Sequence, residues 1–172
     1  MTARTNQSLT MRPMLPDDAA LLAEIFRASV EELGPEDYSP AQVEAWAAAA
    51  DDEAAFAKSL GEQLTLVALL DGEPIGFASL KGNDRLDMLY VHPAVIGKGA
   101  ASMLVDALEK LASARGTKKL KVDASDTAET FFKARGYAPQ SRNTVLRGDE
   151  WLANTTMEKS LGEDKPGEGR LQ

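Results

Sequence analysis

The chain of 172 residues contains no cysteine and only one histidine, His92. Without a thiol the protein can form no disulfide, no thiolate metal site and no acyl-cysteine intermediate. A single imidazole also excludes a metal site built from several histidines. We therefore expect neither a disulfide nor a bound metal.

Long apolar runs and an excess of positive charge are also missing. No segment approaches the roughly 20 apolar residues that span a bilayer, and the N-terminal residues lack the apolar stretch of a secretory signal. Asp and Glu number 27 against 19 Lys and Arg, a net charge of −8, which disfavours nucleic acid as a partner. We expect a cytoplasmic protein without membrane or nucleic-acid partners. The charge weakly favours a cationic or neutral small substrate over a polyanion.

The residues that are present form one domain of ordinary globular composition, with 44% hydrophobic residues. We expect a flexible N-terminus over residues 1–9, a single domain over residues 10–160, and a disordered tail over residues 161–172. The tail carries several glycines among charges, which is typical of a segment that buries little apolar surface.

Periodicity and turn residues predict a mixed α/β (α+β) fold. Helices are expected from Pro16, capped by Asp17, and from Ser39-Pro40. The Asp71-Gly72 pair predicts a hairpin. The other expected helices are 53–60, 97–114 and 126–135, and the strands are 10–15, 64–70, 74–80, 85–91, 119–123, one from residue 137, and 154–159. The strand–helix–strand unit over residues 85–123 should be parallel. The prediction is a mixed sheet of six to seven strands flanked by about four helices.

A glycine loop, Ile96 to Ala101, follows one expected strand and opens a long expected helix. Free N–H groups at a helix start attract an anion, and small residues let phosphate oxygens approach the backbone. The loop is neither a Walker motif nor a dinucleotide fingerprint, because Gly99 is followed by two alanines and position 102 is serine. Alone, this loop fits either a simple turn or an anion site.

Two spaced motifs narrow the choice. The first reads Leu89-Tyr90-Val91-His92-Pro93-x-x-x-Gly97-Lys98-Gly99-Ala100-Ala101, and the second reads Ala128-x-x-Phe131-Phe132-x-x-x-Gly136-Tyr137. Together they resemble the acetyl-CoA-binding motif and the second signature of GCN5-related N-acetyltransferases, the GNAT superfamily. Two further segments resemble a small bacterial subgroup: Asp37-Tyr38-Ser39-Pro40-x-Gln42-x-x-Ala45-Trp46 and Trp151-Leu152-x-Asn154-x-x-Met157-Glu158-Lys159.

The resemblance implies that acetyl-CoA is the co-substrate. Its pyrophosphate would lie on the glycine loop, and its pantetheine arm would enter a gap between two splayed strands, where the Val91 N–H could polarise the thioester carbonyl. The residues implied in binding are Leu89, Tyr90, Val91, Ile96, Gly97, Lys98, Gly99, Ala100, Ala101, Ser125, Ala128, Phe131 and Phe132.

The catalytic residues depart from the family pattern. The tyrosine that usually protonates the thiolate aligns with Phe132, so Ser125, Tyr137 or water would donate that proton instead. Asp87 is the first candidate for general base, and Asp123 is the second. A solvated Asp87 that pairs with a cation is at least as consistent with the sequence. His92 is expected to shape the turn after the strand rather than to act as a base.

Tyr38 and Trp46 could line the acceptor pocket, although Trp46 also fits a core position and Tyr38 a helix-entry contact. The resulting hypothesis is acetyl transfer from acetyl-CoA to a primary amine of a small molecule. Two alternatives stay open: a GNAT-fold sensor that binds acyl-CoA without catalysis, and a protein acetyltransferase acting on lysine or an N-terminus. Either a monomer or a homodimer is consistent with the sequence.

Overall fold

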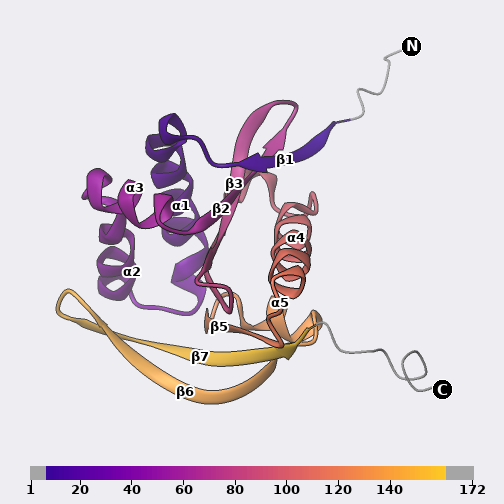
Figure 1. Cartoon of the computed structure of the whole chain (residues 1–172). Helices are drawn as coiled ribbons and strands as arrows, with labels where there is room; N and C mark the ends of the chain where they lie inside the picture. The colour runs from indigo at the N-terminus through magenta and orange to yellow at the C-terminus, as the bar shows by residue number, and fades with distance from the viewer. Residues whose placement is uncertain (1–6, 162–172) are drawn as a thin grey trace, which may run out of the picture.

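The computed structural model describes residues 7–161, so most of the two predicted flexible ends lies outside the described residues (Figure 1). Its strands are β1 (Leu9–Pro13), β2 (Leu64–Leu70), β3 (Glu73–Lys81), β4 (Arg85–Val91), β5 (Lys119–Ser125), β6 (Ala138–Arg147) and β7 (Glu150–Ser160). Its α-helices are α1 (Ala19–Leu33), α2 (Pro40–Ala47), α3 (Glu53–Gly61), α4 (Ala100–Ala114) and α5 (Glu129–Ala134).

The seven strands form one sheet in the order β1-β2-β3-β4-β5-β7-β6. Among the strands of residues 7–161, only β4 and β5 pair in parallel, and all other neighbours are antiparallel. The mixed sheet and the parallel unit predicted from the sequence are therefore confirmed. The parallel pair requires a crossover, which α4 provides.

Helices cover both faces of the sheet (Figure 1). Each face has its own cluster of buried apolar side chains. On one face, α4 and α5 pack through Leu104, Leu108 and Phe132 onto the sheet. On the other face, α1, α2 and α3 pack through Leu22, Trp46 and Phe56. Each cluster buries the apolar side of its helices, which is the main source of stability for such amphipathic segments.

Local signals explain several boundaries. Asp71 and Gly72 both have positive φ, 51° and 85°, as expected for a tight hairpin whose twist matches that of the strands. Ser39 begins α2 as predicted, with its Oγ accepting from the Gln42 N–H at 3.2 Å. Gly116, with φ of +88°, follows the end of α4.

Three boundary predictions were wrong. Asp18, not Asp17, organises the start of α1: its carboxylate accepts from the Leu15 N–H at 2.7 Å and pairs with Arg12. A 3-10 turn occupies Pro16–Asp18 before the α-helix begins. The helix predicted from residue 97 begins at Ala100, because Gly97 and Gly99 have left-handed φ. Strand β1 includes Leu9, inside the segment expected to be flexible.

Candidate active site

The parallel strands β4 and β5 separate soon after they meet. Their register contains only two pairs, Arg85 with Lys121 and Leu86 with Val122, although β4 continues to Val91 and β5 to Ser125. Beyond these pairs the facing edges no longer exchange backbone hydrogen bonds. The strands therefore leave a gap whose edges carry free backbone groups.

A bulge in β4 decides which backbone groups face this gap. Opposite β3, Leu86 pairs with Leu80 and Met88 with Ser79, so Asp87 is an extra residue. After the bulge the His92 N–H donates to the Ile75 carbonyl of β3 at 2.8 Å. Because successive peptide groups alternate, the N–H groups of Leu89 and Val91 point away from β3, into the gap. This orientation is the one needed to pair with an extended ligand arm.

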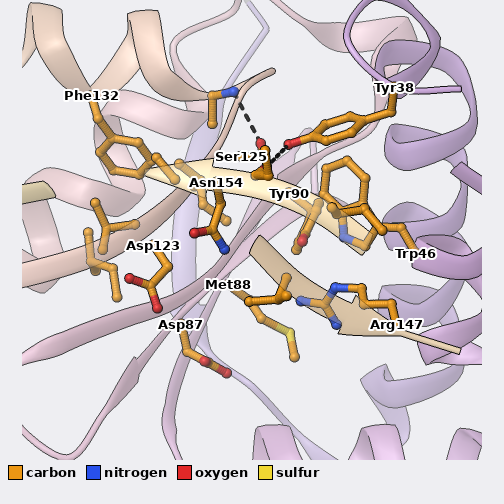
Figure 2. A pocket seen from close by; sticks show the side chains of 18 residues that line it. Tyr38, Trp46, Asp87, Met88, Tyr90, Asp123, Ser125, Phe132, Arg147 and Asn154 are labelled. Atoms are coloured by element: carbon orange, nitrogen blue, oxygen red, sulfur yellow. Dashed lines mark hydrogen bonds between the residues drawn. The ribbon is translucent and has the colours of Figure 1, made fainter. Parts of the chain in front are cut away.

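The gap forms a pocket that passes from one face of the sheet to the other. Its walls include members of the α4–α5 cluster, such as Leu89 and Phe132, and members of the α1–α3 cluster, such as Trp46 and Tyr90. Figure 2 shows Phe132 and Arg147 at opposite ends of the view, with Tyr90, Ser125 and Asn154 between them. The full lining is Tyr38, Trp46, Leu86, Asp87, Met88, Leu89, Tyr90, Val122, Asp123, Ala124, Ser125, Ala128, Phe132, Val145, Arg147, Leu152, Ala153 and Asn154.

Aromatic side chains form the pocket wall beneath α1 and α2. The ring of Tyr90 lies 4.6 Å from that of Phe26 and 6.3 Å from that of Trp46, and Trp46 lies 5.4 Å from Tyr38. Burial raises the pKa of Tyr90 to about 12, and the Trp46 indole and the Arg147 guanidinium oppose the rise. Tyr90 therefore stays a neutral phenol near neutral pH. Trp46 is buried in the core and also lines the pocket.

Tyr38 joins three parts of the pocket through its hydroxyl. The hydroxyl donates to the Ala153 carbonyl at 2.7 Å and accepts from the Asp126 N–H at 2.9 Å. Burial raises the pKa of Tyr38, and the Asp126 N–H opposes the rise. Next to it, the Ser125 Oγ accepts from the Ala128 N–H at 3.2 Å, which leaves the hydroxyl proton available (Figure 2).

The two carboxylates of the pocket differ in their partners. Asp123 accepts from Arg85 at 2.8 Å through one oxygen and from the Thr156 hydroxyl at 2.7 Å through the other. Asp87 accepts only from Gln63, at 2.9 Å, so one of its oxygens has no partner among the described residues. Asp87 is thus the more available carboxylate.

Asn154 and Arg147 also line the pocket, and neither was predicted as a site residue, although Asn154 belongs to the Trp151–Lys159 segment that resembles a bacterial subgroup. Asn143 donates to the Asn154 Oδ1 at 3.0 Å, so the Asn154 amide nitrogen is left as a donor. Arg147 ends β6 next to the hairpin turn. Their inward position depends on the pairing of β6 with β7, a contact that no local motif encodes.

Tyr137 does not fit the predicted role of proton donor. Its side chain is buried, and its hydroxyl donates to Glu109 of α4 at 2.8 Å; Tyr137 is not among the residues that line the pocket. Burial and then the neighbouring carboxylate raise its pKa, so this phenol holds its proton. Phe132 does line the pocket, but it has no proton to give.

The glycine loop lies at the start of α4, outside the lining of this pocket. Gly97 and Gly99 have φ of +86° and +91°, and a Cβ at Gly97 would meet nothing within 4 Å. The first backbone bond of α4 runs from the Met103 N–H to the Gly99 carbonyl at 3.0 Å, which leaves the preceding N–H groups without a helical partner. Open space beside free N–H groups fits an anionic group such as a pyrophosphate.

The remaining predicted residues divide between surface and core. Ile96 is exposed, Ala100 is buried against the sheet, and Phe131 packs at the edge of the α4–α5 cluster. The His92 Nδ1 accepts from the Ala94 N–H at 3.1 Å, so the imidazole caps the following turn, as expected. In residues 7–161 no group of three or more His, Asp or Glu side chains is arranged to hold a metal, and no helix is long and apolar enough to cross a membrane.

Comparisons with known proteins agree with this geometry. Residues 35–161 match the acetyltransferase (GNAT) domain family. The chain is 33% identical over 150 residues to the uncharacterized N-acetyltransferase YafP of Escherichia coli, an alignment that covers 87% of this chain and 95% of YafP.

Solved structures extend the likeness to three dimensions. A GCN5-related N-acetyltransferase from Rhodopseudomonas palustris is 59% identical, with a TM-score of 0.88 and coverage of 92% of this chain and 100% of that one. The PaiA N-acetyltransferase of Thermoplasma acidophilum, crystallised with coenzyme A, shares the fold at 21% identity, with a TM-score of 0.71 and coverage of 89% and 99%. The chain therefore belongs to the GCN5-related N-acetyltransferase (GNAT) family of acetyltransferases.

Proposed function

We propose that the protein transfers an acetyl group from acetyl-CoA to a primary amine of a small molecule. The observation that carries the proposal is the pocket between β4 and β5, which crosses the sheet. Its opening on the α4–α5 face lies on the side of the glycine loop, and its opposite face offers a carboxylate and aromatic walls. Two reactants can thus approach one point from opposite faces.

The loop from Ile96 to Ala101 would hold the pyrophosphate through backbone N–H groups, with Lys98 adding positive charge. The edges of the gap at Leu89 and Val91 would pair with the pantetheine arm as an added strand would. Tyr90, Ser125, Ala128, Phe131 and Phe132 complete the proposed set. When bound, acetyl-CoA supplies an acetyl group activated as a thioester.

The chain's own groups then have separate tasks. The Val91 N–H donates to the carbonyl oxygen of the acetyl group and stabilises the negative charge that develops there. Asp87, with its unpartnered oxygen, takes a proton from the amine. The Ser125 hydroxyl gives a proton to the departing thiolate, and the Asn154 amide adds a hydrogen bond to it. A thiolate needs little help to leave, since a thiol has a pKa of about 8.5.

The proposed acceptor is small because two hydrogen bonds tie α2 and its entry to β7 and narrow the α1–α3 side of the pocket. The bond from Tyr38 to the Ala153 carbonyl ties the α2 entry to β7. The Gln42 amide donates to the Trp151 carbonyl at 2.8 Å and adds a second tie between the same elements. These ties support an acceptor that enters as a single small molecule between Trp46 and Met88.

The test is release of free CoA thiol from acetyl-CoA in the presence of a panel of primary amines. We expect turnover with at least one small amine, and a loss of roughly a hundredfold or more in kcat for Asp87→Asn, because general-base catalysis contributes about that much. Asp84→Asn, on the turn before β4, is the matched control and should keep full activity. Tight CoA binding without thiol release from any amine would instead identify a sensor.

A further inference from the structure

Arg147 is an exposed cation at the rim of the pocket, and its guanidinium has no partner among residues 7–161. Side chains alternate along β6, so Arg147 shares a face with Val145, and both line the pocket. Figure 2 shows the guanidinium directed into the pocket, near Met88. Among residues 7–161, Arg147 makes neither an ion pair within 4.0 Å nor a side-chain hydrogen bond.

The nearby arginines are neutralised, which sets Arg147 apart. Arg85 pairs with Asp123 at 2.8 Å, and Arg142 donates to Asp126 at 2.9 Å. Glu150 is the cross-strand neighbour of Arg147 in the β6–β7 register, yet the two form no ion pair. The guanidinium is therefore available to a ligand, and its charge already acts on the Tyr90 hydroxyl.

The surroundings of Arg147 indicate the ligand's shape. Trp46, Met88 and Val145 give apolar walls, while Asp87 on β4 supplies a negative charge to the same pocket. A site that offers a cation, an anion and apolar walls suits a molecule that carries a carboxylate, an amine and an apolar side chain. In a chain of net charge −8, a local cation offsets the repulsion that a ligand's carboxylate group would otherwise meet.

We propose that the acceptor is an amine that also carries a carboxylate, of the α-amino acid class, and that Arg147 binds the carboxylate. The planar guanidinium matches a carboxylate with two parallel hydrogen bonds, which a lysine could not reproduce. Asp87 attracts the ammonium end and accepts its proton. This inference rests on the proposed function, because the amine is the group that receives the acetyl.

The test compares L-leucine, L-methionine and L-phenylalanine with their carboxamides, which keep the amine and side chain but lose the negative charge. Thiol release is measured for the wild type, Arg147→Gln, Arg147→Lys and the control Arg115→Gln. Arg115 follows the C-terminal end of α4, where its guanidinium donates to the Asn83 side chain. For each acceptor, the rate of the variant is divided by the rate of the wild type, so that differences in the basicity of the amines cancel. Binding of each amino acid to the CoA complex is measured in parallel by calorimetry.

We expect Arg147→Gln to lower kcat/KM for the amino acids by about tenfold to a hundredfold, the effect of losing a charged hydrogen-bonded pair. The carboxamides should change less than about threefold, Arg147→Lys should recover part of the loss, and Arg115→Gln should match the wild type.

Equal losses for both acceptor classes, a loss confined to the KM of acetyl-CoA, or turnover of the carboxamides alone would overturn the inference while leaving the proposed function in place. Amino acids that bind through Arg147 without being acetylated would support the inference and overturn the proposed function. If the amino acids neither bind nor react, the inference is overturned, whether or not other amines are acetylated.

Discussion

The two faces of the sheet contribute different material to one pocket. On the face of α4 and α5, the ligand would meet backbone N–H groups, glycines and the flat ring of Phe132. On the face of α1 to α3, it would meet side chains from α2, β4, β6 and β7, among them Trp46, Asp87 and Arg147. Binding on the α4–α5 face would thus rely mainly on the conformation of the backbone, whereas binding on the α1–α3 face would rely on the identity of the side chains. We therefore expect cofactor binding to tolerate few changes of backbone and acceptor choice to be easily altered.

The largest effect should come from changing the backbone of the glycine loop. In Gly99→Val a β-branched residue must adopt φ of +91°, which L-residues rarely do, so the loop shifts and loses bonds to phosphate. Two lost charged hydrogen bonds correspond to about a hundredfold weaker CoA binding, measured by calorimetry.

Gly116→Val provides the control for this strain. Gly116 has φ of +88° and open space beside it at the opposite end of α4. The free energy of unfolding should fall by a similar amount in both variants, while CoA affinity changes only at Gly99. If CoA binding weakened equally in both, the loop would have no special part in holding the cofactor.

An intermediate effect is expected from the acceptor face, at Tyr38. Tyr38→Phe removes the hydroxyl that joins Ala153 and Asp126, so the wall next to Ser125 loosens. We expect kcat/KM for the amine to fall about tenfold, since positioning errors at a reacting centre are costly, while CoA affinity changes little. An unchanged kcat/KM would show that this bridge does not set the shape of the acceptor site.

The smallest effect on catalysis should come from Tyr137, which belongs to neither wall. Tyr137→Phe removes its bond to Glu109, while Lys159 still donates to that carboxylate at 2.9 Å. We expect unchanged kcat and a loss of about 1 kcal/mol in the free energy of unfolding at pH 7. A large fall in kcat would restore Tyr137 as a proton donor.

The role of Tyr137 can also be tested through the pH dependence of the free energy of unfolding. The folded state raises the pKa of Tyr137, so the contribution of its neutral phenol is complete below pH 10, near the unfolded value. Above that pH the unfolded chain loses the proton first and stability falls. The difference in unfolding free energy between wild type and Tyr137→Phe should therefore shrink as the pH rises above 10.

The fold and the conformation of the glycine loop could be predicted because their causes are local. Gly97, Gly99 and the Asp71-Gly72 pair need backbone conformations that few residues adopt, and the apolar spacing of α4 shows directly in the sequence. Such signals require no knowledge of distant contacts.

The acceptor side could not be predicted in the same way. Arg147 and Asn154 reach the pocket only because β6 pairs with β7 and β7 with β5, and Tyr137 is withdrawn from it by a carboxylate 28 residues away in the chain. The Asp17 prediction was wrong for a similar reason, since Arg12 selects Asp18 as its partner. Tertiary pairing, rather than local preference, decides these positions.

The extra residue in β4 makes the length of this strand as consequential as its composition. Leu86 packs on the α4 side while Met88 packs on the α1 side, an exchange of faces that an unbroken strand does not allow. Removing Asp87 alone would make Leu86 and Met88 neighbours in a regular strand, with both side chains on their present faces and Met88, Leu89 and Val91 still opposite the same residues of β3. The extra residue thus adds a carboxylate to the pocket without disturbing either layer, and in this family of sequences a single-residue gap at this point of β4 would mark the loss of the proposed base.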